Sequence, residues 1–271
     1  MQKKTDSLPA AIIASIRNRK NRVDSSCERQ PGTLVASYNV HKCVGTDKKF
    51  NPERIIQVIQ EIGADVMALQ EADSRFGERT GLLDLARLER DTGLVPIPIA
   101  GISKAHGWHG NVILFREGML RDVHPIKLPG LEPRGALVAE IELKDGSVIR
   151  IIAAHLGLLR RSRAQQARMI VDIMNSRDEK PTLLLGDLNE WRLGTSSSLN
   201  TLHSAFGDLP KAVPSFPAGL PVLALDRIIP NRRGLISAVE AHDTPLARVA
   251  SDHLPIKAFV TVSASMTVQA G

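Results

Sequence analysis

Apolar residues occur along the chain in short runs separated by polar segments rich in glycine or proline, a pattern that predicts β-strands. The clearest run is 183–185, three consecutive leucines, which is typical of a strand buried on both faces. The strands predicted in this way span 33–40, 65–69, 112–115, 137–143, 148–154, 183–185, 222–229, 235–239 and 256–262, with a further short strand near Leu94.

Three other segments have the periodicity of amphipathic helices. The first begins at Asn51, a capping residue followed by Pro52, and ends at Gly63 after several isoleucines at helical spacing. Helices are also predicted over 81–91 and 162–176. Because helices alternate with strands in two successive rounds, the pattern predicts an α/β fold.

The order of these elements indicates one folded domain. The Asp145-Gly146 pair lies between two predicted strands and is typical of a tight hairpin turn, so antiparallel pairs are expected. We expect two packed mixed sheets with helices outside them. The chain then divides into an amino-terminal arm (1–31), the domain (32–263) and a short tail (264–271).

Composition narrows the class of protein. Hydrophobic residues make up 43% of the 271 residues, enough for a sizeable core, and aromatic residues only 3%, so that core is expected to be aliphatic. The two cysteines, Cys27 and Cys43, form neither a disulfide framework nor a zinc-binding spacing. A reducing compartment fits best, and we expect a cytoplasmic protein.

The net charge of +6 is concentrated in the arm. Residues 1–30 hold seven basic and three acidic side chains, which leaves 28 basic and 26 acidic residues in the remainder. Because the rest of the chain is nearly neutral, its charge gives only weak support for a surface that binds nucleic acid. The apolar patch at 8–16 is too short to span a bilayer and is followed by basic residues. The arm's composition favours a flexible tail, and peripheral contact with an anionic membrane is the alternative.

Polar residues recur where the predicted strands end. Two of them, Asp187 and Asn189, follow the leucine run at once, and ligands in α/β folds bind beyond the carboxyl ends of strands. An Asx-type turn explains these two equally well when they are taken alone. The whole set suits metal-assisted hydrolysis of a phosphoester, because oxygen ligands hold Mg²⁺ while His and Asn bind phosphate oxygens. It consists of Asn39, Glu71, His155, Asp187, Asn189, Asp226, Asp252 and His253.

Six short motifs in this order resemble those of the endonuclease/exonuclease/phosphatase superfamily. They are NVH at 39–41, LQE at 69–71, HLG at 155–157, GDLN at 186–189, LDRI at 225–228 and SDHLP at 251–255. Each is weak alone, but six in order across 33–262 are specific. The resemblance implies a four-layered α/β sandwich, a divalent-metal site for Mg²⁺ or Mn²⁺, and hydrolysis of phosphoesters.

The resemblance also implies roles for individual residues. Glu71 would be the main Mg²⁺ ligand, with Asn39 and Asp252 close to the metal. Asp187 would align or deprotonate the attacking water. The remaining implied catalytic residues are Asn189 and His155 as phosphate contacts, and His253, paired with Asp226, on the phosphate or as acid and base.

Three further residues are candidates for binding substrate. Arg75 and Arg134 are placed where a guanidinium can grip a phosphate oxygen. Asn111 resembles the beginning of a family strand, where it either binds substrate or only starts the strand. Glycine-rich sequence before it, which includes Trp108 and His109, is expected to form a lid or a flexible loop.

The substrate is less determined than the chemistry. Few aromatic residues and a nearly neutral body leave a nucleic acid and a phospholipid headgroup as alternative phosphodiester substrates. A phosphomonoesterase of the inositol phosphate type is a second reading, because Arg160, Arg161 and Arg163 follow His155 closely. A non-catalytic binding module is a third, although the chain keeps Glu71. No obligate protein partner is evident.

Overall fold

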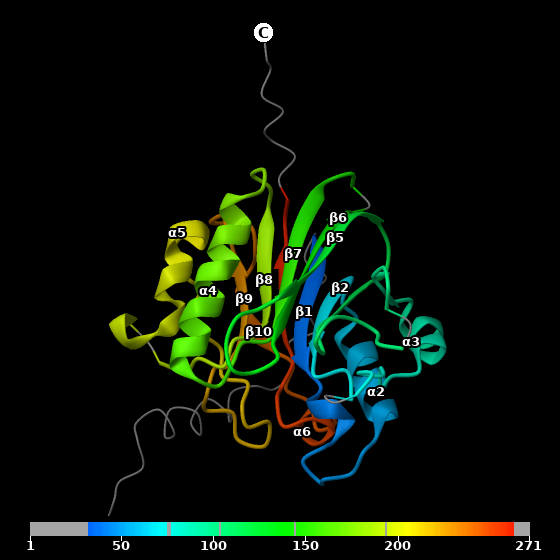
Figure 1. Cartoon of the computed structure of the whole chain (residues 1–271). Coiled ribbons are helices and arrows are strands. Elements are labelled where there is room, and N and C mark those ends of the chain that lie inside the picture. The colour runs from blue at the N-terminus through cyan, green and yellow to red at the C-terminus, as the bar shows by residue number, and fades with distance from the viewer. Residues whose placement is uncertain (1–31, 75–76, 103, 144, 193, 263–271) are drawn as a thin grey trace, which may run out of the picture.

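The computed structural model describes residues 32–74, 77–102, 104–143, 145–192 and 194–262. In Figure 1 the strands stand between two groups of helices, with α4 and α5 on one side and α2 and α3 on the other. The α/β class predicted from the sequence is confirmed. Within the described ranges, no helix is both long and apolar enough to cross a membrane.

The first sheet has six strands in the order β10-β11-β1-β2-β4-β3. β1 pairs with β2 in parallel and with β11 antiparallel. The strands are β1 (Thr33–Asn39), β2 (Val66–Gln70), β3 (Val95–Pro96), β4 (Val112–Phe115), β10 (Glu240–Ala241) and β11 (Ile256–Val260).

The second sheet has five strands in the order β5-β6-β7-β8-β9. Only β7 and β8 are parallel, and the other neighbours are antiparallel. The strands are β5 (Met119–Lys127), β6 (Gly135–Glu142), β7 (Val148–Ala154), β8 (Thr182–Asp187) and β9 (Asp226–Pro230).

Three separate apolar cores make the fold a four-layered sandwich, as expected. The first core packs α2 (Pro52–Ile62) and α3 (Leu85–Thr92) against the six-stranded sheet. The second fills the space between the two sheets with aliphatic side chains of both. The third packs α4 (Arg160–Asn175) against the five-stranded sheet. The shorter helices are η2 (His41–Cys43), η3 (Gly194–Ser196), η4 (Ser198–Leu202), α5 (His203–Phe206) and α6 (Ala247–Ala250).

The predicted elements are mostly found, and three strands show the clearest differences. The strand expected at 235–239 is wrong, because only an isolated bridge from Ile236 to Val260 forms there. The strand expected at 222–229 begins only at Asp226. β5 was not predicted, because its largely exposed side chains leave no buried apolar run in the sequence.

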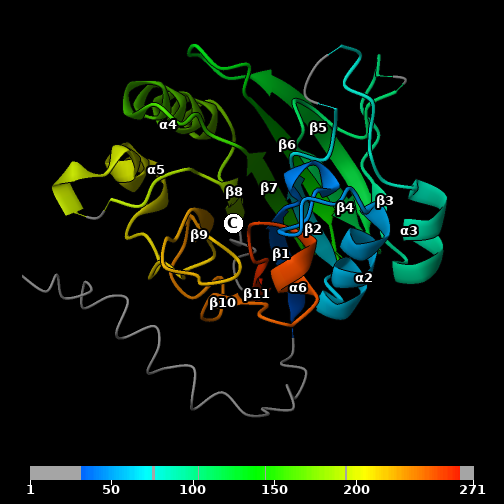
Figure 2. The same cartoon turned by 90° about the horizontal axis from the view of Figure 1, so that it is seen from below.

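Strand direction gathers the polar strand ends at one edge of both sheets. The parallel pairs bring the ends of β1 and β2 together, and likewise the ends of β7 and β8. β9 runs antiparallel to β8 and therefore begins at the same edge, with Asp226 opposite Asp187. β11 likewise begins beside the end of β1. Figure 2 looks onto this edge from below.

Candidate functional site

Asp187 lies where the two sheets meet. The amide nitrogen of Asn39, at the end of β1, donates a hydrogen bond of 2.9 Å to Asp187 Oδ2. The other carboxylate oxygen accepts from the backbone N–H of Asn189 at 3.0 Å. Asn39 and Asp187 are both buried, so this bond ties the end of one sheet to the end of the other.

Gly186 allows β8 to pass close to the end of β7, which positions Asp187. Its φ is +145°, and a Cβ built on it meets the carbonyl oxygen of Ala154 at 1.8 Å. A side chain at this position is therefore incompatible with the close passage of β8 beside the end of β7. The glycine of the GDLN motif thus brings Asp187 beside His155, the residue after Ala154.

His253 and Asp226 form a buried ion pair. His253 Nδ1 lies 2.8 Å from Asp226 Oδ2, which also accepts from the Ser215 hydroxyl at 2.5 Å. Burial lowers the pKa of His253, but the adjacent Asp226 carboxylate outweighs burial, and the pKa rises to about 10. At neutral pH His253 is therefore an imidazolium, with Nδ1–H donated to Asp226 and Nε2–H left for the site.

His155 has the opposite charge state. Burial lowers its pKa to about 4; Asp187 opposes this shift, and the Arg134 guanidinium adds to it. Arg134 Nη1 lies 2.8 Å from both ring nitrogens, and His155 Nε2 lies 3.4 Å from Asp187 Oδ2. We infer a neutral imidazole that accepts from Arg134 at Nδ1 and donates toward Asp187 from Nε2.

Glu71 lies at the mouth of the site, directly after β2. Its Oε2 is 2.6 Å from the ammonium nitrogen of Lys42, and the Lys42 N–H donates to its backbone carbonyl at 3.1 Å. Burial raises the pKa of the Glu71 carboxyl, but nearby His155 and the Lys42 ammonium outweigh it and lower the pKa to about 2. Glu71 is therefore ionised throughout the neutral range.

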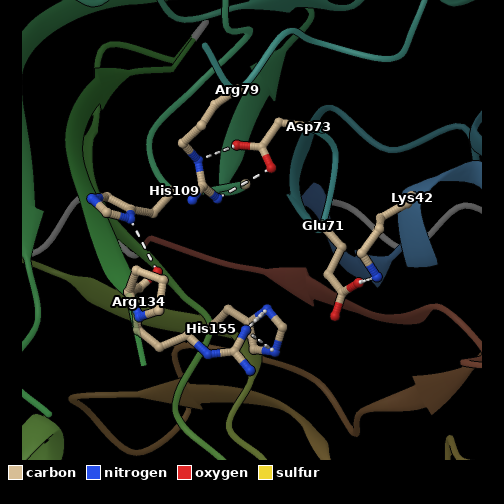
Figure 3. A pocket seen from close by; sticks show the side chains of 9 residues that line it. Lys42, Glu71, Asp73, Arg79, His109, Arg134 and His155 are labelled. Atoms are coloured by element: carbon tan, nitrogen blue, oxygen red, sulfur yellow. Dashed lines mark hydrogen bonds and ion pairs between the residues drawn. The ribbon is translucent and has the colours of Figure 1, made fainter. Parts of the chain in front are cut away.

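A pocket opens beside Glu71 and His155, with the cations Lys42, Arg79 and Arg134 in its lining (Figure 3). On one wall Arg79 binds Asp73 through two hydrogen bonds of 2.7 and 3.1 Å. On another, His109 Nδ1 is 3.0 Å from the Pro133 carbonyl oxygen. The lining consists of Lys42, Glu71, Asp73, Arg79, His109, Gly110, Pro133, Arg134 and His155.

Strained backbone is concentrated around this pocket. Non-glycine residues with positive φ are uncommon, and they occur at functional sites when the surrounding structure holds them there. Here Glu71 has a φ of +54° and Asn189 a φ of +52°. Besides Glu71, the non-glycine residues with positive φ that line the pocket are Lys42, Arg79 and His109. The strain supports a functional interpretation of this edge.

The structure brings most of the predicted site residues together. Asn39, Asp187 and His155 are in contact, and His253 Nε2 lies 3.9 Å from Asp187 Oδ2. Asn189 adjoins them and donates from its amide to the Leu156 carbonyl at 2.9 Å. These positions are consistent with the predicted roles, which stay predictions.

Two predicted residues, Asn111 and Asp252, make no side-chain hydrogen bond or ion pair with the described residues of this group. Asn111 is fully buried, its amide nitrogen donates to the carbonyls of Trp108 and Gly135, and its Oδ1 is buried without a hydrogen-bond partner, so its role in binding substrate stays a prediction. Asp252 is half-exposed and pairs with His41 at 3.5 Å. Arg75 lies outside the described residues.

The donor set fits a magnesium ion held partly by water. In the part of the chain that the structure describes, no three His, Cys, Asp or Glu side chains are placed as a metal cage. Mg²⁺ needs only one or two protein carboxylates beside water and phosphate oxygens. Glu71 supplies an ionised carboxylate that already has a cation beside it. Asn39 and Asp252, the other predicted ligands, stand at the neighbouring strand ends β1 and β11.

Sequence reasoning missed Lys42 and Arg79. Lys42 follows the NVH motif directly, and this position near Asn39 in the sequence could have indicated that it belongs to the site. Arg79 is in a loop with no apolar run before it, and only the fold shows that it reaches the pocket through Asp73. The expected cationic cluster is also different, because Arg163 is fully buried against Glu190 and Ser198.

Comparisons with known proteins agree with the fold and the motifs. A family model described as the Endonuclease/Exonuclease/phosphatase family matches residues 36–253. The "Uncharacterized protein YbhP" of Escherichia coli (strain K12) is 31% identical over 161 residues, which are 56% of this chain and 62% of that protein. The chain thus matches less than two thirds of the length of that relative.

Two solved structures illustrate the likeness in fold. An endonuclease/exonuclease/phosphatase from Beutenbergia cavernae DSM 12333 has a TM-score of 0.63 and 22% identity, covering 85% of this chain and 72% of that one. A mannosyl-6-phosphatase of Bacteroides thetaiotaomicron VPI-5482 also has a TM-score of 0.63, with 16% identity, and the match covers 85% of this chain and 100% of that one. At such identities the likeness concerns the fold.

Proposed function

Because the chain belongs to the endonuclease/exonuclease/phosphatase family, we propose that it is a Mg²⁺-dependent phosphodiester hydrolase. The observation that carries the proposal is the environment of Asp187. Its buried Oδ2 lies 3.4 Å from a neutral His155 and 3.9 Å from a protonated His253. A carboxylate between an uncharged and a charged imidazole suits proton transfer to and from water.

The charge states support a division of roles between a general acid and a general base. His253 keeps its proton to about pH 10, so at neutral pH it donates and does not accept. Asp187 is then the acceptor for the proton of the water whose oxygen attacks phosphorus. As the bond from phosphorus to the leaving oxygen breaks, the Nε2 proton of His253 passes to that oxygen. The proton on Asp187 restores His253 across the 3.9 Å that separates them.

The remaining residues hold the phosphate. Arg134 lines the pocket, with Nη1 donating to His155 and Nη2 2.9 Å from Glu132, so each terminal nitrogen keeps a second N–H for a phosphate oxygen. The Asn189 amide bounds the site on the β8 side. Glu71, with the predicted ligands Asn39 and Asp252, would hold a Mg²⁺ or Mn²⁺ ion, which would supply positive charge to screen the phosphate.

A phosphomonoesterase is the second candidate, favoured by one observation. Lys42, Arg79 and Arg134 all line the pocket, and three cations suit the dianion of a monoester. Each is already paired with a carboxylate, namely Glu71, Asp73 and Glu132 in that order. This pairing favours the singly charged diester. The burial of Arg163 also removes one cation from the inositol phosphate reading.

The test compares a chromogenic phosphodiester with the matching monoester in Mg²⁺, Mn²⁺ or EDTA. Metal-dependent cleavage of the diester that is lost in Asp187→Asn is the expected result. Faster cleavage of the monoester would move the assignment to a phosphatase. If neither ester is cleaved and titration calorimetry detects no Mg²⁺ binding, the binding-module reading holds.

A further inference from the structure

Large exposed apolar side chains gather beside the pocket. Eight large apolar side chains are exposed among the described residues. Four of them lie here, and they come from three separate segments of the chain. We call them the apolar rim: Leu131, Leu158, Leu159 and Trp191, which are 86%, 62%, 50% and 46% exposed. Clustering of this kind marks an interaction surface more often than single exposed leucines do.

Hydrogen bonds and a cation–π contact join the three segments of the rim. The Leu158 N–H donates to Glu132 Oε1 at 2.7 Å, next to Leu131. The Leu158 carbonyl accepts from Arg163 Nη1 at 2.5 Å, and the guanidinium of Arg163 lies 5.7 Å from the ring centroid of Trp191. These contacts place the three segments side by side, with the buried Arg163 between Leu158 and Trp191.

The rim borders the catalytic groups directly. Each of its segments also carries a site residue: Arg134 follows Leu131, Asn189 precedes Trp191, and His155 precedes Leu158. Glu132, which binds the Leu158 N–H, also pairs with Arg134. A surface that docks on the rim therefore faces the pocket.

Three exposed arginines accompany the rim. Arg160 and Arg161 occupy the first turn of α4, where the helix dipole disfavours cations, and no acid lies in that turn. The residue before them, Leu159, is an apolar N-cap without a side-chain hydrogen bond. Arg192 lies with its guanidinium 4.9 Å from the Trp191 ring. The apolar N-cap and the two arginines do not stabilise the start of α4, so a role in binding accounts for these residues better than helix stability does.

We propose that the apolar rim, with Arg160, Arg161 and Arg192, docks on an anionic lipid membrane. Leucine and tryptophan side chains insert at the interface, and arginines bind the acidic headgroups. If the chain has the proposed function, the phosphoester that enters the pocket belongs to a lipid headgroup, and this step rests on the proposed function. Docking itself is independent of catalysis.

Other occupants fit the surface less well. Single-stranded nucleic acid binds by stacking bases on aromatic rings, and three of the four rim residues are leucines. A second copy of the chain would face its own surface across a two-fold axis and would bring the same arginines together. An anionic membrane complements both the apolar and the cationic part.

The test is cosedimentation of the full chain with vesicles of equal parts phosphatidylglycerol and phosphatidylcholine, beside vesicles of phosphatidylcholine alone. We expect binding to the mixed vesicles and about tenfold weaker binding for Leu158→Ser combined with Leu159→Ser. Arg160→Gln combined with Arg161→Gln is a second variant that leaves the rim intact, with the same expectation. Met119→Ser is the matched control, because Met119 is 54% exposed at the far end of β5.

Activity on a small soluble diester separates the two proposals. Both double variants should keep wild-type turnover of that ester, because no substituted side chain lines the pocket. Vesicle binding without turnover in wild type would count against the proposed function alone. Unchanged vesicle affinity in both double variants would overturn the docking proposal. So would variants that lose self-association or single-stranded DNA binding instead of vesicle binding.

Discussion

The Lys42 ammonium lies 2.6 Å from Glu71 Oε2, so the carboxylate predicted to hold a metal already has a cation beside it. Both residues have positive φ, and a backbone hydrogen bond from Lys42 to Glu71 joins them. The Lys42 ammonium therefore neutralises the negative charge of the Glu71 carboxylate. A divalent ion at this carboxylate has to compete with that ammonium.

Lys42→Met should therefore strengthen Mg²⁺ binding, by about tenfold if the pair contributes roughly 1.4 kcal/mol. Glu71→Gln should weaken it, because the ionised oxygen is lost. Isothermal titration calorimetry in the absence of substrate measures both. Lys211→Met, at an exposed position on a loop, is the control and should bind like wild type. An affinity of Lys42→Met equal to that of wild type would show that the ammonium does not compete.

Asp187→Asn should lower turnover by roughly 10² to 10⁴ while the fold is kept, because the amide retains a similar shape but accepts no proton. Thermal unfolding should remain cooperative at a somewhat lower temperature, because the new amide nitrogen cannot accept one of the two hydrogen bonds from Asn39 and Asn189. Asp172→Asn, on the exposed face of α4, is the matched change and should leave turnover unaltered. Full activity of the folded Asp187 variant would exclude it as the base.

The sequence predicted the elements whose signals are local. The helix over Pro52–Ile62 has the expected cap, since Asn51 Oδ1 accepts from the Arg54 N–H at 3.1 Å, and it ends at Gly63 with a φ of +64°. β5 carries no comparable signal, because it is stabilised by pairing with β6 and not by a buried apolar face. Residues 235–239 are apolar, but they contact the core from a loop.

The residues of the candidate site also differ in whether the sequence alone predicts them. Residues at strand ends, such as Asp187 and His155, were found because a short motif follows an apolar run. Lys42 and Arg79 were not, because their positions depend on loop conformations with positive φ and on partners distant in space. The charge states of His155 and His253 also depend on burial and on neighbours that only the fold supplies.

Asp226→Asn should lower the pKa of His253 from about 10 toward its ordinary value, because the strongest raising influence is removed while burial still lowers the pKa and Asp187 and Asp252 still raise it. The alkaline limit of kcat/KM, expected near pH 10 in wild type, should move toward neutrality. The acidic limit set by His155, near pH 4, should stay. Nitrogen-15 NMR of the imidazoles measures both pKa values directly. A pKa of His253 that does not fall would contradict the ion pair.

The same pair makes stability depend on pH. His253 has an ordinary pKa of 6.5 when unfolded and about 10 when folded, so its contribution is complete below pH 6.5 and is lost as the pH rises to 10. His155, with a folded pKa of about 4, acts in the other direction: stability falls as the pH drops from 6.5 to 4. Urea unfolding across this range should show a maximum near pH 6.5, and Asp226→Asn should remove the decline on the alkaline side.

Gly186→Ala should disrupt the site more than the rest of the fold. A methyl group there meets the Ala154 carbonyl oxygen at 1.8 Å, and the φ of +145° is unfavourable for any side chain, so unfolding should need at least ~2 kcal/mol less free energy. Because β8 can relieve the clash only by moving away from β7, Asp187 should separate from His155 and turnover should fall in the fraction that stays folded. Gly219→Ala is the control, since a Cβ there meets nothing within 4 Å. Urea unfolding and turnover of the soluble diester test the two effects, and a Gly186 variant with wild-type values of both would mean that the strands do not pass this closely.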